Sequence, residues 1–377
     1  MKIRNEADYL VHLVRCAIRE EQPQELPEGM SFETVLQFGL WHQVANLAFL
    51  SVKKLNRKPD EALFSKWQAL FFRAVQLDMK QAAVRENILA KFREKGVRSL
   101  EAQGTKVKKL YADPSLRTMS DLDFIVDEEN LGKAGDALEE LGFDVTREHD
   151  QCCGFLGKDI MTEVHFDYLP DDNELYLAIT DPFGDASPDD EEGLCWSPSD
   201  TSFYLFNILH TLKHYRFRGC GIRRILDLYL LKQVYDAKVD HERMAAVFER
   251  YRLTSDAEDL FALAEVWFGS GKMTSHLKEV ATVVYRSAVH GTDEMFLQQK
   301  FRIEREQGKK AVGFQYFMRR LFPTKETLYR CYPVCEKHRL PVFLAWFVHL
   351  GNALFNPAKR ARGKDWVRMI LHTKKMK

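Results

Sequence analysis

The sequence has no excess of positive or negative charge, no CxxC cysteine pair and no long apolar run. Its 377 residues contain 55 Lys and Arg against 55 Asp and Glu, so net charge gives no strong indication of nucleic-acid binding. The seven cysteines include no CxxC pair, which argues against a disulfide framework or a structural zinc site and favours a reducing compartment. Residues 340–355 form the longest apolar run, shorter than the ~20 residues that span a bilayer. The first residues mix charges with apolar side chains, unlike a signal peptide. We therefore expect a soluble cytoplasmic protein.

Several common catalytic motifs are also missing. No Gly-Lys pair has the preceding glycine of a Walker A loop, and GxGxxG, HExxH and GxSxG do not occur. These absences argue against a P-loop NTPase, a Rossmann dehydrogenase, a zincin protease and an α/β-hydrolase.

The first ninety-five residues are predicted to be helical. Ala7, Leu10, Val14 and Ile18 recur at helical spacing, and Ser31 is placed to start a second helix that continues through Leu47. A third helix is expected over 60–95, ended by a glycine at 96.

Residues 96–170 change to a pattern of short strands with one helix. Strands are predicted over 97–100, 122–126, 143–145 and 160–168, with a helix over 131–141 and a hairpin turn near Gly157-Lys158. Residues 171–192 hold nine acidic side chains and no basic one, and we interpret 171–194 as an acidic linker rather than a strand. A helical domain is predicted over 195–377, starting at the Ser197-Pro198 signal. The predicted fold class is α+β, with a small mixed-sheet core flanked by helical regions.

Two carboxylates dominate the second predicted strand. Alternation places Asp121 and Asp123 on one face, ~7 Å apart, while Leu122, Phe124 and Val126 share the other. An acidic-x-acidic triplet is common by chance, and a solvated strand face explains this one equally simply.

A later strand carries a matching polar face. Glu163, His165 and Asp167 alternate there with Thr162, Val164 and Phe166. If the two strands are neighbours, at least three acidic groups converge. Mg²⁺ is bound in this way by a few carboxylates, with substrate phosphates filling its remaining positions.

Several blocks of the sequence resemble a known enzyme family. Residues 103–105 (Gln-Gly-Thr) and 110–126 (Leu-Tyr-Ala-Asp-Pro-Ser-Leu-Arg-Thr-Met-Ser-Asp-Leu-Asp-Phe-Ile-Val) are similar to the uncharacterised nucleotidyltransferase family of the DNA polymerase β-like superfamily. Further blocks match in order at 141–143, 163–166, 210–214, 223–228 and 321–326. Gln103 stands where the family usually has lysine, and Ala112 where it usually has proline.

The resemblance implies roles for particular residues. Asp121, Asp123 and Glu163 would be the catalytic carboxylates and the ligands of Mg²⁺ or Mn²⁺, with Glu163 also activating the acceptor hydroxyl as general base. Gly104 and Thr105 would hold the β- and γ-phosphates through backbone N–H groups. Arg117 would pair with a phosphate, and Lys106, Lys108 or Lys109 would replace the charge missing at Gln103.

The function implied is metal-dependent transfer of a nucleoside monophosphate from an NTP, ATP by default, to an unidentified acceptor hydroxyl or phosphate, with release of pyrophosphate. The acceptor is a small molecule, a glycan or a protein. A second interpretation, motivated by Gln103, is a non-catalytic relative that binds nucleotide or protein. A third places the protein at a membrane surface in a polysaccharide or peptide-product assembly system, because the aromatic run 340–355 precedes a tail, 356–377, with eight Lys and Arg against one Asp.

His210 and His214 are spaced to share a helix face. A zinc pair has this spacing, but no third ligand is evident, so a structural hydrogen bond, for example to Asp227, is the simpler explanation. His165 either orients a carboxylate, contacts substrate or is structural.

Overall fold

The computed structural model describes residues 4–101, 103–149, 152–166, 181–289, 318, 322–325, 328 and 341–355. The chain divides into two compact units, one formed by residues 1–215 and 219–291, the other by 216–218 and 292–377. Asp167, residues 171–180 of the acidic linker and the basic tail 356–377 lie outside the described residues.

Four helices begin the first unit: α1 (Glu6–Ile18), α2 (Phe32–Trp41), α3 (Ala45–Val52) and α4 (Glu61–Glu94). The side chains of Ser31 and Asp60 cap α2 and α4 by accepting backbone N–H groups, and Gly96, at φ +64°, follows the end of α4. The predicted continuous helix through Leu47 is wrong, because the chain turns at Gln43 (φ +53°) and begins a new helix at Ala45.

A seven-stranded mixed sheet follows in the order β3-β4-β5-β2-β1-β7-β6. Its strands are β1 (Ser99–Glu101), β2 (Asp121–Val126), β3 (Asp144–His149), β4 (Cys152–Gly157), β5 (Ile160–His165), β6 (Ser187–Pro188) and β7 (Cys195–Ser197). The two parallel pairings are β2 with β5 and β1 with β7. β6 corrects the prediction of no strand in the acidic stretch, and β7 corrects the prediction that the helical domain begins at residue 195.

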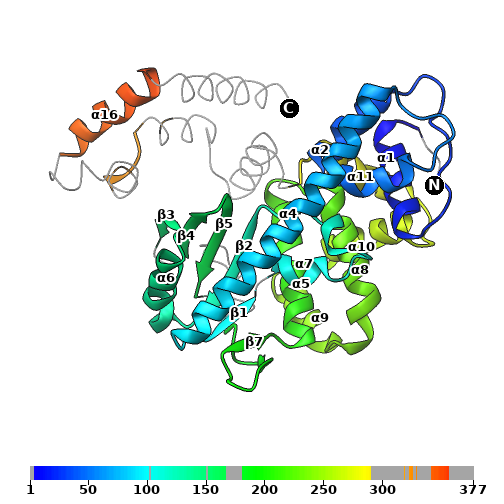
Figure 1. The fold of residues 1–377 in the computed structure, drawn as a ribbon. Helices are drawn as coiled ribbons and strands as arrows, with labels where there is room; N and C mark the ends of the chain where they lie inside the picture. Colours follow the sequence, from blue (N-terminus) through cyan, green and yellow to red (C-terminus); the bar gives the residue numbers. More distant parts are fainter. Residues whose placement is uncertain are drawn as a thin grey trace. The chain divides into compact units, whose positions relative to one another are not determined.

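One face of the sheet is covered by the C-terminal half of α4 and by α6 (Leu131–Glu140), as Figure 1 shows. Ile88 and Phe92 from α4, Leu138 from α6 and Phe124 and Val164 from the strands form one buried cluster. Phe92 meets Phe124 edge to face, with 5.5 Å between ring centroids. Because strand side chains alternate, this packing leaves Asp121, Asp123 and Glu163 for the opposite face.

Two short helices precede β2: α5 (Gln103–Lys108) and the 3-10 turn η1 (Pro114–Leu116). A second 3-10 turn, η2 (Glu128–Asn130), leads from β2 into α6. Beyond the sheet the chain is helical, in α7 (Asp200–Phe217), α8 (Ile222–Tyr235), η4 (Asp236–Lys238), α9 (His241–Arg250), α10 (Thr254–Phe268) and α11 (Ser275–Arg286).

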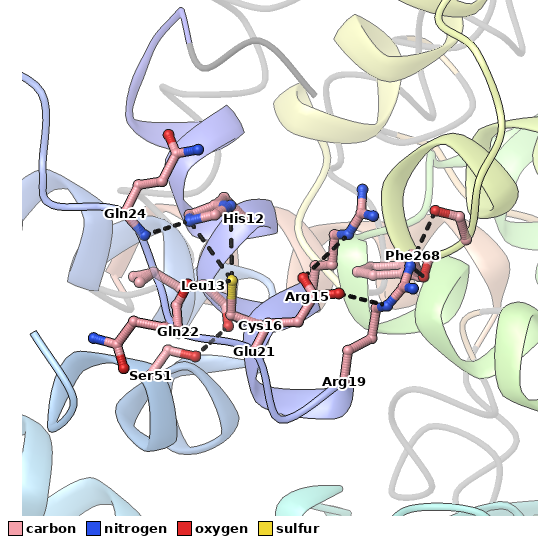
Figure 2. Close-up of polar contacts among 11 residues, drawn as sticks. His12, Leu13, Arg15, Cys16, Arg19, Glu21, Gln22, Gln24, Ser51 and Phe268 are labelled. Atoms are coloured by element: carbon pink, nitrogen blue, oxygen red, sulfur yellow. Dashed lines mark hydrogen bonds and ion pairs between the residues drawn. The ribbon is translucent and has the colours of Figure 1, made fainter.

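The N-terminal helices are joined directly to the later ones. The Arg19 guanidinium, just after α1, donates to the carbonyls of Phe268 and Gly269 at 3.5 and 3.3 Å, and Ser51 of α3 donates to the carbonyl of Leu13 at 2.6 Å (Figure 2). Residues 4–95 and 222–286 lie in the same compact unit as the sheet.

The second unit is described at α16 (Val342–Phe355) and a few residues near it. The Trp346 indole N–H donates to the carbonyl of Pro323 at 2.9 Å, and Leu328 and Ala345 are buried together. Phe343 and Phe347, one helical turn apart, are 56% and 71% exposed. Among the described helices, none combines the length and apolar character needed to cross a bilayer.

Candidate active site

The two acidic strands predicted from the sequence are neighbours. In the parallel pairing of β2 and β5, Asp123 is in register with Glu163, and Ile125 with His165. The neighbouring positions Leu122, Thr162 and Val164 are buried, so the strands are held by their apolar face. The prediction that carboxylates from both strands share one face is confirmed.

Asp123, Glu163 and His165 form a cluster of possible metal ligands. One donor atom from each lies within 4.8 Å of the others. The Nε2 atom of His165 is 3.5 Å from Oε2 of Glu163 and 3.8 Å from Oδ1 of Asp123. The three side chains are 28%, 24% and 12% exposed, in the order Asp123, Glu163, His165. Two carboxylates and an imidazole at this spacing fit a divalent cation such as Mg²⁺ or Mn²⁺.

Asp121 lies at the start of β2, two residues before Asp123, and is half-buried. Its Oδ1 accepts a hydrogen bond from the Ser120 hydroxyl at 3.1 Å. Burial raises the pKa of Asp121 to about 6, and the negative charges of Asp123 and Glu163 contribute to the increase. Asp121 is therefore electrostatically coupled to the cluster, and a cation placed there would relieve the repulsion.

Arg117, for which the family resemblance implies a contact with phosphate, is paired with a carboxylate of the protein itself. Its Nε and Nη2 donate to the two carboxylate oxygens of Asp227 at 2.8 and 2.9 Å, and the Tyr111 hydroxyl donates to Oδ1 of the same residue at 2.7 Å. All three side chains are buried. The charge of Arg117 holds the pKa of Asp227 below its usual value despite burial. This bidentate pair fixes the chain just before β2 to α8.

The loop that enters β2 is also held by side chains of α3 and α4 and by a second residue of α8. The Asn46 side-chain amide of α3 donates to the carbonyls of Ser115 and Leu116, each at 3.0 Å. Gln81 of α4 donates to the carbonyl of Met119 at 3.1 Å, and Arg223 of α8 to that of Thr118 at 2.8 Å. Because these bonds are buried or part-buried, they set the position at which β2 begins with Asp121.

Gly104, Thr105 and Lys106 are part of α5 rather than of an open turn. A Cβ on Gly104 would lie 2.6 Å from the Met119 sulfur, so a larger residue there would force the Met119 side chain to shift. Thr105 is buried. The Lys106 ammonium contacts the Ser197 hydroxyl of β7, and burial lowers its pKa. Lys108 pairs with Asp78 of α4, and Lys109 is exposed.

His210 and His214 stack on one face of α7, with ring centroids 4.9 Å apart and Nε2 atoms 2.9 Å apart. A guanidinium nitrogen of Arg224 lies 3.4 Å from Nε2 of His210. Asp227, proposed above as the partner of the histidines, forms its bidentate pair with Arg117.

The contacts of Arg223 and Arg224 were not predicted from the sequence. A signal was present, because two arginines in the first turn of a helix oppose its macrodipole. Asn46 and Gln81 carried no signal, since their partners are backbone carbonyls distant in sequence.

A family model described as uncharacterised nucleotidyltransferase matches residues 28–269. The chain belongs to this family. It is therefore a nucleotidyltransferase by family, with an α+β fold, and the matched segment contains both acidic strands and α8.

Two solved structures of ANT(2'')-Ia are similar to part of the chain. The solution structure of this antibiotic-resistance factor is 16% identical, covers 48% of this chain and 96% of its own, and has a TM-score of 0.35. The crystal structure with adenylyl-2''-tobramycin is 17% identical, covers 46% and 99%, and has a TM-score of 0.36. No curated protein matches the sequence.

Proposed function

We propose that the protein transfers a nucleoside monophosphate from an NTP to an acceptor hydroxyl or phosphate, with release of pyrophosphate, and that the reaction depends on Mg²⁺ or Mn²⁺. The observation that carries the proposal is the register of Asp123 with Glu163 on parallel strands, with His165 beside them. In the same proposal Asp121, Asp123 and Glu163 hold the metal, and Gly104, Thr105 and Lys106 remain candidates for the nucleotide side of the site.

The residues present suit such a metal. Burial, together with the nearby charges of Asp123 and Glu163, raises the pKa of Asp121, and His165 adds a nitrogen ligand or orients Glu163. A bound divalent cation would screen phosphate charge and stabilise the leaving pyrophosphate.

In the proposed transfer, the protein's own side chains position charged groups around the reacting phosphate and accept a proton. In the proposed step an acceptor hydroxyl oxygen bonds to the α-phosphorus while the bond from that phosphorus to the bridging oxygen of the β-phosphate breaks. The electron pair leaves with pyrophosphate, and the hydroxyl proton moves to the Glu163 carboxylate. A phosphate acceptor requires no such proton transfer.

The test is pyrophosphate release with labelled NTPs, ATP first, in the presence of a cell extract that supplies acceptors. Asp123→Asn and Glu163→Gln are expected to lower the rate by at least about a hundredfold. Asp159→Asn, in the turn between β4 and β5, is the matched control, because its carboxylate is 97% exposed and pairs only with Lys80 at the surface among the described contacts. Magnesium-dependent nucleotide binding without pyrophosphate release from any acceptor pool would favour the binding-only interpretation instead.

A peripheral membrane contact through 340–377 is a second proposal. It is supported by the exposure of Phe343, Leu344 and Phe347 on α16 and by the basic residues that follow in the sequence. Co-sedimentation with anionic vesicles should be lost on removing 356–377 and reduced by Phe347→Ser. Binding that ignores lipid charge, or that survives both changes, would contradict it.

A further inference from the structure

The N-terminus of α8 concentrates positive charge beside the acidic strands. Arg223 and Arg224 lie in its first turn, no acidic residue accompanies them there, and the N-cap Gly221 provides no side-chain acceptor. The helix macrodipole adds positive character at this end, so two cations are unfavourable here unless an anion is close.

Burial makes an uncompensated positive charge costly at this helix end. Arg117, Arg223 and Arg224 are each 6% exposed, and Asp227 is the buried carboxylate among them. Its two oxygens are occupied by Arg117 and Tyr111. Buried charges are stable when paired, and among the described contacts the Asp227 carboxylate is hydrogen-bonded to Arg117 and not to Arg223.

Arg223 is the least satisfied of the three. Its Nη1 donates to neutral oxygens, the carbonyl of Thr118 and the side chain of Gln43, while its Nε is buried and has no acceptor among the described residues. Burial, followed by the nearby charge of Arg117, lowers the pKa of Arg223 to about 9. The guanidinium thus retains the capacity to bind an anion.

The location of Arg223 links this cluster to the site. Thr118, which Arg223 contacts, is three residues before Asp121, and the charges of Arg117, Arg223 and Arg224 all interact with Asp121. Of the lysines that precede Asp121 in sequence, Lys106 and Lys108 contact Ser197 and Asp78, and Lys109 is exposed. A cation bound by the carboxylates would leave the positive charge of α8 available to an anionic ligand.

We propose that Arg223, assisted by Arg224, binds the polyphosphate end of the nucleotide and the pyrophosphate released from it. The inference rests on the proposed function, since it assigns the phosphate-recognising residues of the same site. Arg223 is then a substrate-binding residue. The phosphate groups that residues of α5 were expected to bind are bound by α8 in this proposal.

The experiment measures pyrophosphate and tripolyphosphate binding by calorimetry, first with EDTA and then with Mg²⁺. Arg223→Gln is expected to weaken binding about tenfold or more, because a charge-assisted contact is lost, and Arg223→Lys to weaken it less. Binding by the unchanged protein should fall as salt is raised. Arg250→Gln, an exposed arginine at the end of α9, is the control and should bind normally.

A purely structural role for Arg223 is distinguished by Mn²⁺ binding, measured by electron paramagnetic resonance. The proposal requires that Arg223→Gln keep Mn²⁺ binding while it loses phosphate binding. Loss of both together, or phosphate binding equal to the unchanged protein, overturns it. If Arg223→Gln does not fold, Arg224→Gln and Arg223→Lys are read by the same criteria.

The outcome is separable from that of the proposed function. Phosphate binding that depends on Arg223, without transfer to any acceptor, would support this site and contradict the transferase reaction. Pyrophosphate release with an unchanged KM for NTP in Arg223→Gln would support the reaction and overturn this site.

Discussion

Asp123 and Glu163 occupy paired positions on parallel strands, although forty residues separate them in the sequence. Because a one-residue slip would turn every side chain to the other face, the buried Leu122 and Val164 effectively enforce the meeting of the two carboxylates.

The first prediction concerns metal binding at this pair. Asp123→Asn and Glu163→Gln should each weaken Mn²⁺ binding at least about tenfold, since even residues that only support metal ligands have effects of that size. Electron paramagnetic resonance of free Mn²⁺ measures it, with Asp159→Asn as control. Unchanged affinity in both variants would place the metal elsewhere.

The second prediction concerns the buried pair of Arg117 and Asp227. Asp227→Asn should lower the free energy of unfolding by about 3 kcal/mol or more, because it leaves guanidinium charges buried without compensation. Tyr111→Phe should cost about 1 kcal/mol, the value of one hydrogen bond. Urea unfolding measures both. The double variant should lose less than the sum, as the two changes act on one carboxylate; strict additivity would argue against a shared network.

The third prediction concerns the contact of Gly104 with Met119. Gly104→Ala should destabilise the protein by about 1–3 kcal/mol, because the new methyl group would overlap the sulfur of a buried side chain. Met119→Ala leaves a cavity when made alone, but it should remove most of the penalty of Gly104→Ala when the two are combined. If the two substitutions changed the free energy of unfolding independently in urea, the contact with Met119 would not be what disfavours alanine at position 104.

The fourth prediction concerns pH. His42 is fully buried, accepts a hydrogen bond from the Ile222 backbone N–H at Nδ1, and has its pKa lowered by burial to about 4. The unfolded chain, with an ordinary pKa of 6.5, binds the proton first as pH falls. Stability from neutral His42 is therefore present above pH ~6.5 and is lost as pH falls toward 4.

Between pH 7 and 5 this loss amounts to about 2 kcal/mol. Urea unfolding at the two pH values should show it, and His42→Asn, which keeps an acceptor but does not titrate, should show a smaller difference. An equal pH dependence in the variant would assign the effect to other groups.

Local patterns predicted much of this fold. The alternation at 121–126 and 160–165 identified both strands and their polar faces, and glycines at 96 and 142 marked the ends of α4 and α6. Periodicity could not detect the break at Gln43, since a left-handed residue other than glycine depends on the packing around it. β6 and β7 were missed because two or three residues are too few to show a pattern.

The acidic residues of the site could be predicted because strand alternation is local, whereas the basic residues could not. From the sequence, Arg117 is predicted to bind phosphate. In the structure its guanidinium is hydrogen-bonded to Asp227, which lies 110 residues later in the chain. The surroundings of Arg223 likewise depend on Gln43 and Thr118, which only the tertiary structure brings together.

The buried hydrogen bonds to residues 115–119 have a practical consequence for anyone who shortens this protein. A fragment limited to the strands and α6 would lose Asn46, Gln81, Arg223 and Asp227, and with them the anchors of the segment that leads into Asp121. Such a fragment would expose the apolar side of its sheet and leave its carboxylates on an untethered strand end. The smallest piece worth expressing therefore runs from before α3 to beyond α8.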